Sequence, residues 1–164
     1  MSGSRVVASA AEMVNLVELT GIKVYDIAGH LVEPPALEAS TTDDPDRQPE
    51  PRTPGESFAV FARGGDTWFE TRTKLVVQTV EADLSADAGA IFTYSEPLTV
   101  SREVAGEFVE KVGVMAVYPF VREQVFTTAS RLGVAPPVMG LLRAGQFRIE
   151  LPTEDHVANP DGHA

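Results

Sequence analysis

Alternating hydrophobic and polar positions predict a series of β-strands in the first part of the chain. Apolar residues recur at every second position over Val14–Val32, with a change of phase at Gly21 that indicates a bulge. A short strand is predicted at Ser57–Ala62, ending in the turn sequence Arg63–Asp66, and a long strand at Trp68–Ala82.

A further strand is predicted beyond a short polar segment. Asp83–Gly89 contains two aspartates and a glycine and is typical of a turn, whereas Ala90–Val100 again alternates. Successive strands joined by tight turns form an antiparallel meander.

The hydrophobic period then changes from two to that of a helix. Ser101 is a favourable N-cap for a helix over 102–112, which Gly113 is expected to interrupt. A longer, strongly apolar helix is predicted from Val114 to Leu132, with Gly133 as its C-cap. The chain is therefore predicted to be an α+β protein whose long helix covers the sheet.

The long helix has more apolar surface than one sheet requires. One stripe contains Val114, Val117 and Val121, and a single stripe is enough to cover a sheet. The second stripe predicts contact with another copy of the chain, the alternative being extra packing within a monomer. Arg122 beside it either remains solvated or forms an ion pair with another element. The predicted interface residues are Met115, Tyr118, Arg122, Phe126 and Ala129.

Three segments are expected to lie outside the packed core. Residues 1–13 are small and weakly polar and predict a disordered N-terminus, and residues 152–164 predict a disordered acidic tail. Residues 33–57 contain six of the 12 prolines and seven acidic residues, a composition typical of a flexible linker. The alternative is a flexible flap beside a binding groove. A single domain is expected over 14–151.

Charge and composition exclude several classes of partner. The net charge is -11, from 13 Lys and Arg against 24 Asp and Glu, which argues against nucleic acid or an anionic membrane. The chain has no cysteine and no apolar run of membrane-spanning length, so a soluble, cytoplasmic protein is expected.

No motif points to catalysis or to a cofactor. The sequence contains no phosphate-binding glycine loop and no nucleophile elbow. His156 and His163 lie near Asp155 and Asp161, but a solvated tail is favoured over a weak metal site because no regular element holds these side chains together. We therefore expect no enzyme activity, no cofactor and no metal.

Apolar residues outside the predicted core are the candidates for binding. They include Met and Leu side chains, which form adaptable contact surfaces of low selectivity. Taken alone, they predict a soluble oligomer with an apolar groove. These candidates are Phe58, Val60, Trp68, Val138, Met139, Leu141 and Leu142.

The long helix carries a more specific pattern. Tyr118-Pro119-Phe120-Val121-Arg122-Glu123, followed by Val125, Arg131 and Pro136-Pro137, resembles the SecB export-chaperone family. The resemblance implies a four-stranded antiparallel sheet with the helix, broken near Gly113, on one face. It also implies a homotetramer built as a dimer of dimers, acting as an ATP-independent holdase for unfolded polypeptides. The family's client groove would include the crossover loop Leu31–Ser57, with Leu31 and Val32 at its start, the strand from Phe58 to Ala62, and the stretch after Pro137.

Two segments differ from the family pattern. In the family the first strand carries acidic residues that help to dock the SecA translocase, whereas Gly21–Tyr25 has none. After the proline stop, Gly140–Gly145 is too rich in glycine for a stable helix. Two chaperone roles therefore remain open, delivery to SecA and protection of an antitoxin in a toxin–antitoxin system. The alternative from another class is a non-chaperone interaction subunit with one dedicated protein partner.

Overall fold

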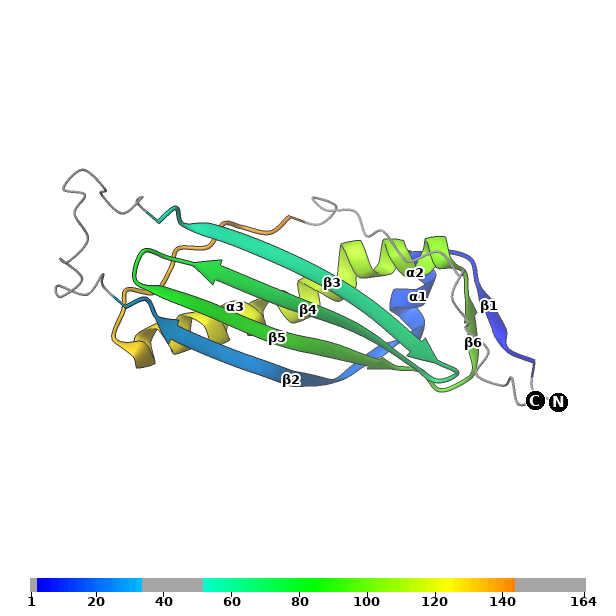
Figure 1. The fold of residues 1–164 in the computed structure, drawn as a ribbon. Helices are drawn as coiled ribbons and strands as arrows, with labels where there is room; N and C mark the ends of the chain where they lie inside the picture. Colours follow the sequence, from blue (N-terminus) through cyan, green and yellow to red (C-terminus); the bar gives the residue numbers. More distant parts are fainter. Residues whose placement is uncertain (1–2, 34–51, 144–164) are drawn as a thin grey trace, which may run out of the picture.

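A four-stranded antiparallel sheet forms the centre of the protein, as predicted. The computed structural model describes residues 3–33 and 52–143. The strand order is β2-β5-β4-β3, so β2 and β3 form the two edges (Figure 1). The strands are β2 (Glu18–Leu31), β3 (Gly55–Gly65), β4 (Trp68–Gln78) and β5 (Ala82–Thr93).

The two central strands place alternate side chains in the core. In β5, Ala82, Leu84, Ala86, Ala88 and Ala90 are all buried, and each points to the same face because side chains alternate along a strand. Four of these five residues are alanines, so the helix that covers them can approach closely. Leu75 and Val77 of β4 extend the same buried face.

A nearly continuous helical segment covers this face. It consists of α2 (Arg102–Phe108), a π-helical turn (Val109–Gly113) and α3 (Val114–Leu132). Figure 1 shows α3 running along one face of the sheet. The buried stripe of α3 contains Val114, Val117, Val121, Val125 and Ala129. Each valine in this position contributes roughly 1.5–3 kcal/mol relative to exposure.

Both predicted helix caps are confirmed. The Ser101 hydroxyl accepts a hydrogen bond from the Val104 amide at 3.3 Å and caps α2. Gly133 has a φ of 77°, the left-handed conformation that glycine adopts without steric cost, and it ends α3.

The predicted interruption at Gly113 takes a different form. The helix continues through Gly113, which has right-handed helical dihedrals, as part of the π-helical turn. A Cβ atom at this position would lie 2.8 Å from the Thr71 Cβ and closer still to its hydroxyl. Gly113 therefore allows the helix to pack directly against β4, and the break in the α-helical pattern is a change of helix type.

The prediction of a disordered N-terminus is wrong for the described residues. β1 (Arg5–Val7) pairs in parallel with β6 (Leu98–Val100), and α1 (Ala10–Leu16) follows. Met13 has no exposed surface, and Ser9 caps α1 by accepting a hydrogen bond from the Glu12 amide. The small residues of this segment pack against the core, and the Ser9 cap and the buried Met13 stabilise α1. The helix has only seven residues, which is too short for its hydrophobic pattern to indicate a helix.

Several strand boundaries also differ from the prediction. Val14 lies in α1, and β2 begins only at Glu18, although the bulge near Gly21 is confirmed by a shift of register. Asp83–Gly89 is wrongly predicted as a turn and lies within β5, because Asp87 forms an ion pair with Arg72 on the neighbouring strand. The turn is instead at residues 79–81, and the predicted strand Ala90–Val100 divides between β5 and β6.

The predicted linker and tail are covered only in part. β3 begins at Gly55, inside the segment 33–57, and extends past Ala62 to Gly65. Residues 34–51 of the linker and the whole tail 152–164, with His156 and His163, lie outside the described residues.

Candidate functional site

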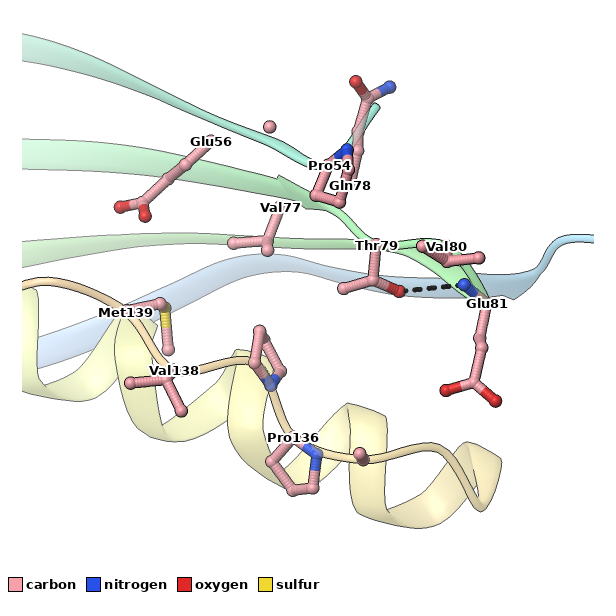
Figure 2. A pocket seen from close by; sticks show the side chains of 13 residues that line it. Pro54, Glu56, Val77, Gln78, Thr79, Val80, Glu81, Pro136, Val138 and Met139 are labelled. Carbon is pink, nitrogen blue, oxygen red and sulfur yellow. Dashed lines mark hydrogen bonds between the residues drawn. The ribbon is translucent and has the colours of Figure 1, made fainter. Parts of the chain in front are cut away.

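A groove of about 550 Å³ lies where the β4–β5 turn, the start of β3 and the segment after α3 meet (Figure 2). We call it the hairpin groove. Its lining residues are Pro54, Gly55, Glu56, Val77, Gln78, Thr79, Val80, Glu81, Ala135, Pro136, Pro137, Val138 and Met139.

Hydrogen bonds of Thr79 hold the strand side of the groove. The Thr79 hydroxyl accepts a hydrogen bond from the Glu81 amide at 3.2 Å (Figure 2). It also accepts one from the Ala82 amide at 2.9 Å, and together these bonds close the tight turn between β4 and β5. The Val32 amide donates to the Glu81 carbonyl at 2.8 Å and brings the end of β2 beside this turn. This wall is therefore fixed by backbone and side-chain bonds together.

The opposite wall is the extended segment that follows α3. Gly133 ends the helix, and Pro136 and Pro137 favour extended backbone at the residue before each of them, so the chain continues without a helix. The Tyr118 hydroxyl donates to the Gly140 carbonyl at 3.2 Å, and the Tyr118 ring meets Phe58 edge-on at 5.9 Å. Burial raises the pKa of this hydroxyl above its ordinary value, so it stays protonated as a donor. Tyr118 thus links α3, β3 and the returning segment.

The groove combines a buried floor with exposed apolar side chains. Val77 and Met139 are 5% and 4% exposed, whereas Val80 is 63% and Val138 is 99% exposed. Glu56 and Glu81 are exposed carboxylates at the same site. Exposed apolar side chains beside a preformed depression can gain contact area when a partner covers them. The chemistry available here is the binding of apolar groups.

Two of the nine predicted binding residues, Val138 and Met139, line the groove. Phe58 packs against Tyr118, which in turn bonds to the Gly140 carbonyl on the segment after α3. Leu31 is 54% exposed and is paired in register with Ala82, next to the turn, and Val32 bonds to that turn directly. Val60 and Leu142 are half-buried against the core, and Leu141 is 77% exposed on the returning segment.

Trp68 is not part of this group. It stands at the first position of β4, and the groove lies at the last, roughly 30 Å away at the usual rise per residue in a strand. There the Trp68 ring contacts the guanidinium of Arg63, whose central carbon is 5.7 Å from the ring centroid. Its role is in the packing of the other end of the sheet.

Val77 and Val80 are among the lining residues that the sequence did not predict for binding. Both lie in the predicted strand Trp68–Ala82, which places Val80 inside a strand. The structure instead places Val80 in the turn at residues 79–81, where it is 63% exposed.

The predicted interface residues divide into two groups. Tyr118 and Ala129 are 7% and 0% exposed within one chain, so their own sheet and returning segment already cover them. The prediction that they face another subunit is wrong for that physical reason. Phe126 is 53% exposed, Arg122 is exposed and Met115 is half-buried, so these three remain on the outer flank of α3.

The described residues do not assemble a metal site. Over 3–33 and 52–143, no group of three His, Asp or Glu side chains is placed to hold an ion. In the same ranges, no helix combines the length and apolar character needed to cross a membrane.

The chain is similar to a curated protein and to a solved structure. No model of a protein family matches the chain. The chain is 38% identical over 138 residues to the SecB-like chaperone SmegB of Mycolicibacterium smegmatis, covering 84% of each protein. The fold is similar, with a TM-score of 0.61 and 17% identity, to the Mycobacterium tuberculosis SecB-like chaperone Rv1957 in complex with a ChAD peptide from the HigA1 antitoxin. That match covers 81% of this chain and 96% of the other.

The fold comparison agrees with the four-stranded sheet and long helix described above. The matched residues make up 84% of this chain and 84% of SmegB. The chain belongs to the SecB-like chaperone family.

Proposed function

We propose that this protein is an ATP-independent holdase that retains non-native polypeptide segments in the hairpin groove. The observation that carries the proposal is the pair of exposed valines, Val80 and Val138, above an apolar floor of Val77 and Met139. Membership of the SecB-like chaperone family supports it. The sequence contains no phosphate-binding loop, which is consistent with capture that needs no nucleotide.

The size of the apolar surface fits reversible capture. Each large apolar side chain that moves from water into the groove gains roughly 1.5–3 kcal/mol, and ordering an unfolded segment opposes this gain. One or two such anchors per groove give weak binding, so several grooves in an assembled oligomer would hold one client more firmly. We accordingly propose a homotetramer acting in the cytoplasm.

An antitoxin segment is the client class that we favour. The structurally similar chaperone Rv1957 is in complex with an antitoxin peptide, which supports an antitoxin segment as a client here. Delivery to SecA is the alternative, but Gly21–Tyr25 of β2 lacks the acidic residues that the resemblance associates with that contact. We therefore place antitoxin protection before protein export.

The proposal is tested by suppression of aggregation without ATP. A chemically unfolded client is diluted into buffer with the protein, and light scattering is followed over time. The unchanged protein is expected to suppress aggregation. Val138→Asp is expected to weaken suppression by about tenfold in the concentration required, because a charge replaces a contact worth roughly 1.5–3 kcal/mol.

Val6→Asp provides the matched control. Val6 is 72% exposed on β1, at the end of the molecule opposite the groove, so the substitution introduces the same charge without touching the site. Equal loss in both variants, or no suppression by the unchanged protein, would contradict the holdase proposal. Tight binding of one protein with no effect on other unfolded clients would instead identify a dedicated interaction subunit.

A further inference from the structure

The face of the sheet that α3 does not cover carries a cluster of cations in an otherwise acidic protein. Arg72 of β4 is paired in register with Gly89 of β5, and Gly89 with Lys23 of β2. Lys74 is two residues beyond Arg72 on the same face, and Arg63 of β3 is paired with Glu70. Adjacent strands are about 4.8 Å apart, so Lys23 and Arg72 lie within roughly 10 Å of each other. We call these four residues, Lys23, Arg63, Arg72 and Lys74, the cation cluster.

Carboxylates beneath the cluster hold its two guanidinium groups in place. The Arg63 Nε is 2.5 Å from Glu70, and Arg72 binds both oxygens of Asp87 at 2.7 Å. The Glu70 side chain has no exposed surface and that of Asp87 is 7% exposed, whereas Arg63 is 63% and Arg72 is 38% exposed. The negative charges therefore lie inside and the positive charges face the solvent.

Tyr25 fixes the same arrangement from the edge strand. Its hydroxyl bonds to Glu70 and accepts from Arg63 at 3.1 Å, and the guanidinium carbon of Arg72 is 4.1 Å from its ring centroid. The hydrogen bond to Glu70 raises the pKa of Tyr25, so the hydroxyl remains neutral within the network. Because the arginines are held from three directions, they lose little side-chain freedom when a partner binds.

The local charge differs in sign from that of the whole chain. The four cations of the cluster face three carboxylates, Asp26, Glu70 and Asp87, which gives +4 - 3 = +1, against a net charge of -11 for the chain. Only Asp26 among these carboxylates is exposed. Lys23 and Lys74 are exposed and form no ion pair with the described residues. Glu18 and the ion-paired Arg52 and Asp83 lie nearer the two ends of the same face.

An apolar side chain adjoins the cluster. Phe61 is paired in register with Arg72, so it points to the same face, and it is 54% exposed. Fixed guanidinium groups, two exposed lysines that pair with none of the described carboxylates, and one exposed aromatic ring match a peptide with carboxylates around an apolar residue.

We propose that the cation cluster with Phe61 is a docking surface for an acidic segment of a partner protein, separate from the hairpin groove. The two surfaces lie on opposite faces of the sheet. Side chains alternate between the two faces along β4, so Val77 of the groove points to the face opposite that of Arg72 and Lys74. A client and a second protein can therefore be bound together. A nucleic acid is disfavoured as the occupant, since the charge of -11 repels a polyanion as a whole while a short acidic segment meets only the local field.

The test uses a short synthetic peptide with glutamates around one phenylalanine, carrying a fluorescent label, and measures anisotropy with the full-length protein. The double variant Lys23→Glu with Lys74→Glu is expected to weaken binding by at least about tenfold, because two attractive contacts become repulsive. The matched control is Arg102→Glu with Arg131→Glu, which makes the same change of net charge at exposed positions on the helices. The control should bind within about twofold of the unchanged protein.

Two further probes fix the class of partner. The same peptide with glutamines in place of glutamates should not bind measurably, and binding of the acidic peptide should weaken as salt rises. Tighter binding of a single-stranded DNA oligonucleotide, equal loss in both double variants, or no binding of the acidic peptide would each overturn the proposal.

The outcome is distinguishable from that for the holdase function. The variant Lys23→Glu with Lys74→Glu should still suppress aggregation, and Val138→Asp should still bind the acidic peptide. Loss of both activities in either variant would contradict two separate surfaces.

Discussion

Gly113 is a contact residue of the helix–sheet interface. Its position in a helix would ordinarily cost about 1 kcal/mol relative to alanine. Here, however, the Thr71 side chain occupies the space that a Cβ atom would need. The buried hydroxyls of Thr71 and of Thr73, two residues further along β4, have no hydrogen-bond partner among the described residues. Glycine is therefore favoured at position 113 because it lets the helix approach β4 closely, although alanine has the higher helix propensity.

Gly113→Ala is accordingly expected to destabilise the protein. The added methyl group must displace β4 or the helix, which typically costs about 1–3 kcal/mol beyond the gain in helix propensity. Chemical unfolding followed by circular dichroism measures the change in the free energy of unfolding. Gly140→Ala is the control, because nothing lies within 4 Å of a Cβ atom there. A stabilised Gly113→Ala variant would show that the interface is looser than described.

Single residues of the groove were predictable to different degrees. Val138 and Met139 could be predicted as binding residues, because they are apolar and follow a double proline that comes after the end of the predicted helix. Val77 and Val80 were not predicted as groove residues, because the groove forms only where the turn at residues 79–81 lies beside the segment after α3. The partners of Tyr118, Phe58 and the Gly140 carbonyl, are far apart in sequence and were not visible in any local pattern.

At the scale of elements, α3 is covered on two sides by its own chain. The sheet buries one stripe, and β3 with the returning segment covers Tyr118. The remaining apolar surface is smaller than the sequence pattern indicated, but it includes Phe126, which is 53% exposed, and Phe120, which is 44% exposed. We infer that the outer flank of α3 is the place where another subunit packs.

Phe126→Glu is expected to reduce the molecular mass in solution without unfolding the chain. Burying two or more charges in a subunit interface costs several kcal/mol, which is enough to dissociate an assembly at micromolar concentration. Size-exclusion chromatography with static light scattering should show a tetramer for the unchanged protein and a smaller species for the variant.

Phe61→Glu is the control for that measurement, because Phe61 is 54% exposed on the face of the sheet that α3 does not cover. A monomeric unchanged protein, or equal dissociation in both variants, would contradict an interface along α3.

The elements that sequence reasoning placed correctly are those with long, regular patterns. The capped helix beginning after Ser101, the end of α3 at Gly133 and the bulge near Gly21 each follow from local chemistry. The short strands β1 and β6 pair with each other across about ninety residues, and a local sequence pattern cannot indicate such a pairing. The short helix α1 follows β1 and was missed with it. Asp83–Gly89 has the composition of a turn, and only the cross-strand partner of Asp87 explains its place in β5.

On the scale of the whole molecule, the sheet separates two surfaces of different chemistry. The hairpin groove lies on the side of α3 and offers apolar side chains, and the cation cluster lies on the opposite face. The predicted fold class is confirmed, and the family assignment made from the Tyr118–Glu123 motif is supported by 38% identity to SmegB. The cation cluster was not predicted, because its members come from three strands whose register had to be known.

The central claim is that non-native polypeptides bind in the hairpin groove, and a label placed there tests it most directly. The chain has no cysteine, so Val138→Cys provides a single attachment point for an environment-sensitive fluorophore in the groove. Val6→Cys places the same label at a similarly exposed residue remote from it. Titration with an unfolded client, without ATP, should give a saturable blue shift at position 138 and none at position 6. No shift at position 138, or equal shifts at both positions, would contradict the account.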